Sequence, residues 1–314
     1  MLKKIPIVVS FVILAAIIWF ANPAKLLDTV LNANKIFLLI GLLVSTVALS
    51  MRVVRWKFLL RKVSFYHLYP VQMLGMTISN FTPGKIAEPT KSVLLKMRSG
   101  VPVSESLVSI IWERIFDLVV LLIFAIFGMK LLASSEQFFL FGVLGMVFFS
   151  CVVITAFFTI KSRRFGTKIF SIARKFPVLK RISDNFIATF YETKFRWTHL
   201  AESFAATAAA WALDAVVLYL ILMSIGIQPE YTVLCGIIAL SGIIGIASSL
   251  PGGLGSTEVV MTLMITLTGV PTSTAVIGVL LMRFMSFWYN ALLGGLSFIY
   301  LSKKIDVNSI LGKH

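Results

Sequence analysis

A chain of 314 residues in which 58% are hydrophobic and only 13% are charged is too apolar for a soluble domain, where charged residues make up about a quarter. The net charge of +16 could suggest a nucleic-acid partner, but the basic residues stand at the ends of apolar runs, as on the cytoplasmic face of a membrane protein. Cys151 and Cys235 both lie in apolar stretches, so we expect no metal or thiol site and no cofactor. The sequence therefore predicts an all-α polytopic membrane protein with no nucleic-acid partner.

Six apolar runs approach the roughly 20 residues that a helix needs to cross a bilayer. In chain order they are residues 5–22, 36–51, 104–130, 137–160, 200–226 and 274–301. The first run follows Lys3 and Lys4 and resembles the apolar core of a signal peptide, but we interpret it as a membrane helix.

Two further apolar segments, 68–98 and 232–269, are interrupted by proline and glycine at 83–84 and 251–253. Proline lacks the amide donor and glycine is costly to order, so both stop a helix. Irregular backbone is tolerated at membrane depth only where protein buries it or it lines a wet cavity. We expect two re-entrant helical hairpins with their tips at these residues; two pairs of short spans are the alternative.

The sequence around the two breaks recurs. A Pro-Gly break leads to a glutamate, a Gly-Val-Pro follows, and an arginine stands twelve residues after that proline. The matching stretches are 83–88 and 251–258, 100–102 and 269–271, and Arg114 and Arg283. They predict two repeats within one transmembrane domain, 1–314, the first about 1–130 and the second about 137–302.

The basic residues sort by side if each hairpin returns to the side that it entered. Of the 29 Lys and Arg, 24 then lie on one side and three on the other, with Arg114 and Arg283 inside spans. The positive-inside rule places the first side, and both termini, in the cytoplasm. The two repeats then have opposite orientations, as in transporters whose inverted repeats meet at a binding site near the bilayer midplane.

Residues 161–199 form the longest polar stretch between spans and carry ten Lys and Arg. Apolar residues such as Phe165, Ile169 and Phe170 alternate with them at helical spacing. This pattern favours a basic amphipathic helix in the inner headgroup layer. A solvated loop that only sets the topology explains the composition equally well.

Several ionisable residues are expected near the middle of the bilayer, where a charge costs about 2.5–3.5 kcal/mol on insertion scales and usually faces a bundle interior or a water-filled path. They are Glu113, Arg114, Asp117, Asp214 and Arg283. Arg114 can pair with Asp117 at i, i+3. Arg283 has no acid within four residues, so it must pair with Asp214 or Glu258 or meet an anionic substrate. An ion network that only locks the helices and a substrate site are both compatible with these residues.

The hairpin tips carry groups that suit an anion, because helix N-termini present free amides and a positive dipole end. The candidate substrate-binding groups there are Gly84, Lys85, Gly252, Gly253, Ser256 and Thr257. Glu88 and Glu258 follow the breaks and are either helix caps or acids that couple transport to an ion gradient. Glu258 has no basic neighbour in sequence, so we expect it to be the better proton carrier.

The sequence contains no nucleotide-binding glycine pattern, zinc motif or nucleophile elbow. We therefore expect that the protein is not an enzyme. A membrane-embedded transferase or phosphatase acting on a lipid phosphate is the alternative, and a scaffold whose basic loop recruits a soluble partner is another.

Three motifs resemble the membrane domain of bacterial lysylphosphatidylglycerol synthase/flippases and their stand-alone prokaryotic relatives, and the likeness covers nearly the whole chain. They are Pro83-Gly84-x-x-x-Glu88, Glu113-Arg114-x-x-Asp117 and the stretch 251–258. The resemblance implies an integral protein of a prokaryotic cytoplasmic membrane that flips a lipid without synthesising it. The lipid could be a phospholipid, an aminoacyl lipid or a polyprenyl-phosphate carrier, and a homo-oligomer is compatible with the sequence.

We therefore expect a lipid flippase or scramblase in which a headgroup phosphate meets Arg114, Arg283 and the two hairpin tips. The acids that tune this polar site or couple it to protons are expected to be Glu88, Glu113, Asp117, Asp214 and Glu258.

Overall fold

The computed structural model describes residues 23–132, 136–173 and 184–304, and every element in those ranges is helical. The span expected at 5–22 lies outside the described residues. Within them, four helical stretches are long and apolar enough to cross a membrane: Lys35–Leu59, Gly142–Thr159, Trp197–Ser224 and Thr272–Ser302. The chain is thus a helical protein with the apolar helices of a polytopic membrane protein.

The first half of the described chain contains a short helix, a long one, a broken pair and a second long helix. These elements are α2 (Pro23–Asn32), α3 (Lys35–Leu59), α4 (Phe65–Asn80), the 3-10 turn η2 (Pro83–Lys85), α5 (Thr90–Ser99) and α6 (Val103–Leu132). α3 begins where the side chain of Asn34 accepts a hydrogen bond from the backbone N–H of Ile36, and α5 ends at Gly100, which takes the left-handed conformation at φ 70°.

The second half adds three helices before a similar order recurs. They are α7 (Glu136–Lys161), α8 (Arg163–Ala173) and α9 (Asp184–Glu192). The recurring order is α10 (Trp197–Ser224), α11 (Tyr231–Ala247), the 3-10 turn η3 (Pro251–Gly253), α12 (Ser256–Leu267), α13 (Thr272–Arg283), the π-helical segment η4 (Phe284–Trp288) and α14 (Tyr289–Ser302).

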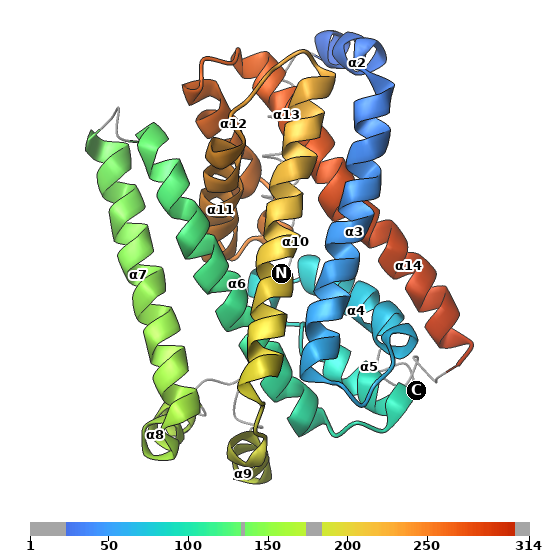
Figure 1. Cartoon of the computed structure of the whole chain (residues 1–314), viewed down its shortest axis with the longest axis vertical. Coiled ribbons are helices and arrows are strands. Elements are labelled where there is room, and N and C mark those ends of the chain that lie inside the picture. Colours follow the sequence, from blue (N-terminus) through green and yellow to red (C-terminus); the bar gives the residue numbers. More distant parts are fainter. Residues whose placement is uncertain (1–22, 133–135, 174–183, 305–314) are drawn as a thin grey trace, which may run out of the picture.

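Each interrupted segment folds as two helices joined by a tight turn. Gly84 and Gly252 stand at the same place in the two turns, with φ of 58° and 60°, a region that glycine enters without steric strain. In Figure 1, α11 and α12 occupy the upper half of the molecule and α4 and α5 the lower half. The turns η2 and η3 contact each other. The two turns therefore meet between the two ends of the molecule, having approached from opposite ends (Figure 1).

The helices of the two halves exchange partners. α3 lies along α10, α11 packs on α6, and α4 packs on α14 (Figure 1). Where α6 and α11 cross, a Cβ added at Gly236 would lie 2.1 Å from the backbone N of Gly128, so the two backbones touch. Small residues allow such close approach between membrane helices, where van der Waals contact drives association.

α8 and α9 appear end-on in Figure 1, so they run across the long axis of α7 and α10. The hydroxyl of Tyr191 in α9 donates a hydrogen bond to the carbonyl of Thr159 in α7, 2.8 Å away, and α8 packs against both helices. Within the stretch 161–199, for which the sequence favours an amphipathic helix, the described residues form two short helices, α8 and α9, and residues 174–183 lie outside the described ones.

α3 runs eight residues beyond the end expected at residue 51. The sequence-based expectation assigned Arg52 and Arg55 to a cytoplasmic basic segment, but both are helical and Arg55 is buried. Acids from α6 and α10 neutralise the two arginines, so the helix can continue through them.

Candidate functional site: a neutral cluster of ion pairs beneath the first turn

Four basic and four acidic side chains from separate parts of the chain lie together below η2. This ion-pair cluster consists of Arg52 and Arg55 of α3, Glu88 and Lys91 from the first hairpin, Glu113, Arg114 and Asp117 of α6, and Asp214 of α10. The formal charges cancel. Charges in a membrane protein are accommodated when they pair in this way inside the bundle.

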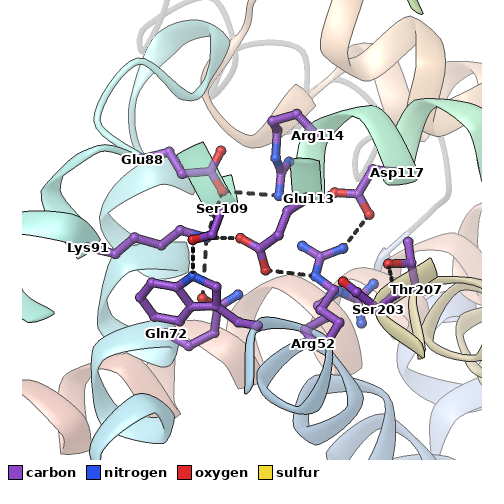
Figure 2. Close-up of polar contacts among 12 residues, drawn as sticks. Arg52, Gln72, Glu88, Lys91, Ser109, Glu113, Arg114, Asp117, Ser203 and Thr207 are labelled. Atoms are coloured by element: carbon purple, nitrogen blue, oxygen red, sulfur yellow. Dashed lines mark hydrogen bonds and ion pairs between the residues drawn. The ribbon is translucent and has the colours of Figure 1, made fainter. Parts of the chain in front are cut away.

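Glu113 lies at the centre of the cluster (Figure 2). One of its oxygens accepts a hydrogen bond from Nε of Arg55 at 3.0 Å and the other from Nζ of Lys91 at 2.5 Å. All three side chains are buried. Lys91 also lies over the ring of Trp56, 4.8 Å from its centroid, and contacts the side-chain oxygen of Gln72 at 3.3 Å. Glu113 thus holds α3 and α5 against α6.

Asp117, one turn further along α6, connects a third helix. Its Oδ1 accepts hydrogen bonds from Nη1 of Arg55 at 2.5 Å and from Nε1 of Trp211 in α10 at 2.9 Å. Its Oδ2 lies 3.0 Å from Nη2 of Arg114. The i, i+3 pairing of Arg114 with Asp117 that the sequence predicted is therefore present, and Asp117 in addition joins α3 to α10.

Arg114 lies between Glu88 on one side and Asp117 on the other (Figure 2), 3.0 Å from each carboxylate. Its side chain is 32% exposed, whereas that of Arg55 is 2% exposed. Lys85, in η2, is half-buried, and within the described chain no carboxylate lies within ion-pair distance of it. The open side of the cluster therefore carries an accessible guanidinium and an unpaired ammonium group.

Asp214 belongs to the same cluster through Arg52. Nη2 of Arg52 lies 2.5 Å from Oδ2 of Asp214, and the guanidinium stands 5.4 Å from the ring centroid of Trp211. Because Asp214 already has this partner, it does not serve as the acid for Arg283, which was one of the expected possibilities.

The second turn carries a smaller polar site. Nε of Arg283 lies 2.7 Å from Oε1 of Glu258, and its Nη2 donates a hydrogen bond to the carbonyl of Gly252 at 2.7 Å. The other oxygen of Glu258 accepts the backbone N–H of Gly255 at 2.7 Å, so this acid also caps α12. Glu258 therefore has a direct basic partner that sequence neighbours did not reveal.

The hydroxyl groups expected at the second turn are engaged locally. Ser256 donates to the carbonyl of Gly253 at 3.1 Å and contacts the hydroxyl of Ser248 at 2.8 Å. Thr257 is buried against Gly245 and Gly253. These hydroxyls stabilise the second turn. In the first turn, the candidate residue Gly84 is exposed.

Comparison with known proteins identifies the family. A family model described as the lysylphosphatidylglycerol synthase TM region matches residues 7–294. The chain belongs to this family. The resemblance carried by the three sequence motifs is thereby confirmed over nearly the whole chain.

Similar members of the family come from archaea. A UPF0104 membrane protein of Methanothermobacter thermautotrophicus is 28% identical over 304 residues, which cover 90% of this chain and 89% of the relative. A UPF0104 membrane protein of Pyrococcus horikoshii is 24% identical, covering 98% of this chain and 100% of the relative. A third, from Methanocaldococcus jannaschii, is 20% identical over 97% and 96% of the two chains.

Sequence reasoning did not assign to this site five residues that belong to the ion-pair cluster or contact it: Arg52, Arg55, Gln72, Lys91 and Trp211. The available signal was that Arg52 and Arg55 stand three residues apart, on one helical face, directly after an apolar run. Ending the span at its first charge hid that signal.

In the described ranges, no three His, Cys, Asp or Glu side chains lie together so as to hold a metal ion.

Proposed function

We propose that this member of the family is a lipid flippase or scramblase that moves an anionic or phosphate-bearing lipid across the cytoplasmic membrane. The observation that carries the proposal is the place where the two turns meet. Each turn is tied to an arginine, Arg114 through Glu88 and Arg283 through Glu258, and η2 contacts η3. Arginine is well suited to a phosphate because its planar fork donates two parallel hydrogen bonds, so the proposal needs at least one of these two arginines as a ligand. The family model is itself described by a lipid-related name.

The exchange of partners between the halves supports a transport mechanism. An inverted repeat places a binding site at its pseudo-twofold axis, near the bilayer midplane, and moving one repeat against the other opens the site to each side in turn. In this proposal the α4–α5 and α11–α12 hairpins are re-entrant and enter from opposite faces. The acyl or prenyl chains stay in the bilayer while the headgroup crosses beside the polar cluster.

The distribution of exposed basic residues supports a cytoplasmic position for the end of the molecule that carries α5, α8 and α9. Exposed there are Lys62, Lys96, Arg163, Arg164, Lys168 and Lys194. Anionic lipids of the inner leaflet attract such residues. With the span that the sequence predicts at 5–22, the proposed topology also places both termini in the cytoplasm.

The test is lipid redistribution in liposomes that contain only the purified protein. A headgroup-labelled phospholipid in the inner leaflet should become accessible to an impermeant quencher faster with the protein than without it. Arg114→Gln should slow this redistribution, and Lys96→Gln, at an exposed position on α5, should not. Mass spectrometry of the same lipids addresses the alternative function. Redistribution no faster than in empty liposomes would contradict the proposal, and a covalently changed lipid would favour the transferase or phosphatase.

A further inference from the structure

We infer that a phosphate group binds between Arg114 and Lys85. Arg283, the corresponding arginine of the second half, stabilises the fold through its ion pair with Glu258 and is not a second phosphate ligand. This inference rests on the proposed function and names which of its two arginines meets the substrate. The phosphate could belong to a lipid headgroup or be free in solution, and the experiment below separates these sources.

The acids that hold Arg114 each have another cation. Glu88 lies 3.2 Å from Nζ of Lys91, and Asp117 keeps Arg55 at 2.5 Å. Arg114 can therefore turn toward a ligand without leaving a buried carboxylate unpaired. Arg55 also shares its acids, but its side chain is 2% exposed and has no access to a ligand. Of Arg114 and Arg55, only Arg114 has both acids that keep another cation and a side chain that a ligand can reach.

Arg283 is in the opposite situation. Glu258 is 0% exposed, and across the described ranges Arg283 is the one cation within ion-pair distance of it. Arg283 also holds the carbonyl of Gly252 and lies over the ring of Phe287, 5.0 Å from its centroid. Turning Arg283 away would leave a buried carboxylate without its counter-ion, which is strongly unfavourable. Its side chain is only 13% exposed.

The surroundings of Arg114 favour an added anion. Its Nε is buried and has no hydrogen-bond partner among the described residues. Lys85 lies beside Glu88 in the turn, where its carbonyl accepts the Glu88 N–H at 3.0 Å, and Glu88 in turn pairs with Arg114. The remaining cluster is neutral, and Lys85 therefore supplies one uncompensated positive charge. A single phosphate negative charge would neutralise it, and the guanidinium could donate to the phosphate oxygens.

The experiment compares single and paired neutralisations in the two halves. Arg283→Gln should lower the unfolding temperature, and adding Glu258→Gln should recover much of it, because no unpaired charge remains and the amide oxygen can still cap Gly255. Transport, which Arg283→Gln alone should impair, should return in this double variant. Arg114→Gln should keep most of the stability and lose transport, and adding Glu88→Gln should not restore transport.

Binding is measured separately by native mass spectrometry and by the shift of the unfolding temperature with added ligand. The probes are phosphatidylglycerol, phosphatidylcholine and inorganic phosphate. We expect Arg114→Gln and Lys85→Gln to weaken phosphatidylglycerol binding at least tenfold, and Arg283→Gln/Glu258→Gln to leave it within about twofold. Stabilisation by inorganic phosphate alone, lost in Arg114→Gln, would place a free phosphate at the same site.

The outcomes also separate this inference from the proposed function. If the wild type transports lipid and Arg114→Gln transports it equally well, the inference is wrong and the flippase proposal stands. The same holds if adding Glu258→Gln to Arg283→Gln does not restore transport. Phosphatidylglycerol binding that depends on Arg114 in a protein without transport would uphold the site and remove the flippase.

Discussion

Arg283 and Glu258 form an ion pair of 2.7 Å in the second half of the chain, and Arg114 and Glu88 form an ion pair of 3.0 Å at the corresponding places in the first. In both halves the glutamate follows the Pro-Gly turn, and the arginine stands twelve residues after a Gly-Val-Pro. Each pair therefore ties a turn to the helix that follows its hairpin. The two pairs differ in their surroundings, since the first is shared with other ions and the second is closed.

Arg55 should be essential for stability. Arg55→Gln removes two ion pairs from side chains that are almost fully buried, so we expect the free energy of unfolding to fall by about 3 kcal/mol or more. The matched control is Arg61→Gln, whose exposed pair with Glu202 should contribute less than about 1 kcal/mol. Both are measured by denaturant unfolding in detergent micelles, and equal losses would mean that the cluster does not stabilise the fold.

The crossing of α6 and α11 should tolerate no added methyl group at Gly236. The new Cβ would meet backbone atoms of Gly128 at 2.1 and 2.2 Å, and backbone cannot rotate out of the way. Gly236→Ala should therefore separate the helices and cost on the order of 3 kcal/mol or more, as strained overpacking does.

Gly145→Ala on α7 is the control for that substitution, because nothing lies within 4 Å of its added Cβ. It should be neutral or raise stability by about 0.5–1 kcal/mol, since alanine is the better helix former. A variant at 236 as stable as the variant at 145 would contradict the close contact.

The packing of the second turn against η4 and the end of α4 can be tested at Gly252. Alanine there is strained at φ 60°, and its Cβ would lie 2.3 Å from Phe287 and 3.1 Å from the carbonyl of Asn80. Gly84→Ala carries the same strain at φ 58°, but its nearest new neighbour is Ser249 at 3.8 Å. We expect Gly252→Ala to lower the unfolding temperature clearly more than Gly84→Ala. The difference reports packing alone, and its absence would contradict the close contacts of Gly252 with Phe287 and Asn80.

The proposed sidedness predicts which positions an impermeant thiol reagent can reach. In a variant with Cys151 and Cys235 replaced by serine, cysteines at Lys62 and Lys194 should react only from the cytoplasmic side. Cysteines at Gln228 and Thr272 should react only from outside. All four positions are exposed.

The hairpins predict a further result with the same reagent. Cysteines at Pro83 and Pro251 should react more slowly than all four loop positions, because the proposed topology places both turns within the membrane, away from both of its faces. Reaction at loop rates would show that the breaks are ordinary loops, and reaction of all four loop positions from one side would contradict the topology.

Much of the architecture was predictable because its signals are local. Runs of apolar residues mark the helices, and Pro-Gly stops a helix wherever it occurs, so the turns at 83–85 and 251–253 lie at the expected residues. The helices expected at 104–130 and 137–160 end within two residues of α6 and α7. The motif residues around Arg114 identified the family for the same reason, since they are close together in sequence.

What the sequence by itself determined is thus where the long helices and the breaks are, and that Glu113, Arg114, Asp117, Asp214 and Arg283 lie within apolar runs. Only the tertiary structure decided which charges meet. Arg55 reaches Asp117, 62 residues away, and Arg52 reaches Asp214, 162 residues away, because α3 packs against both α6 and α10. A span was expected to end at its first arginine because an unpaired charge is costly at membrane depth. That cost disappears once a distant helix supplies the acid, and no local pattern records which helix it will be.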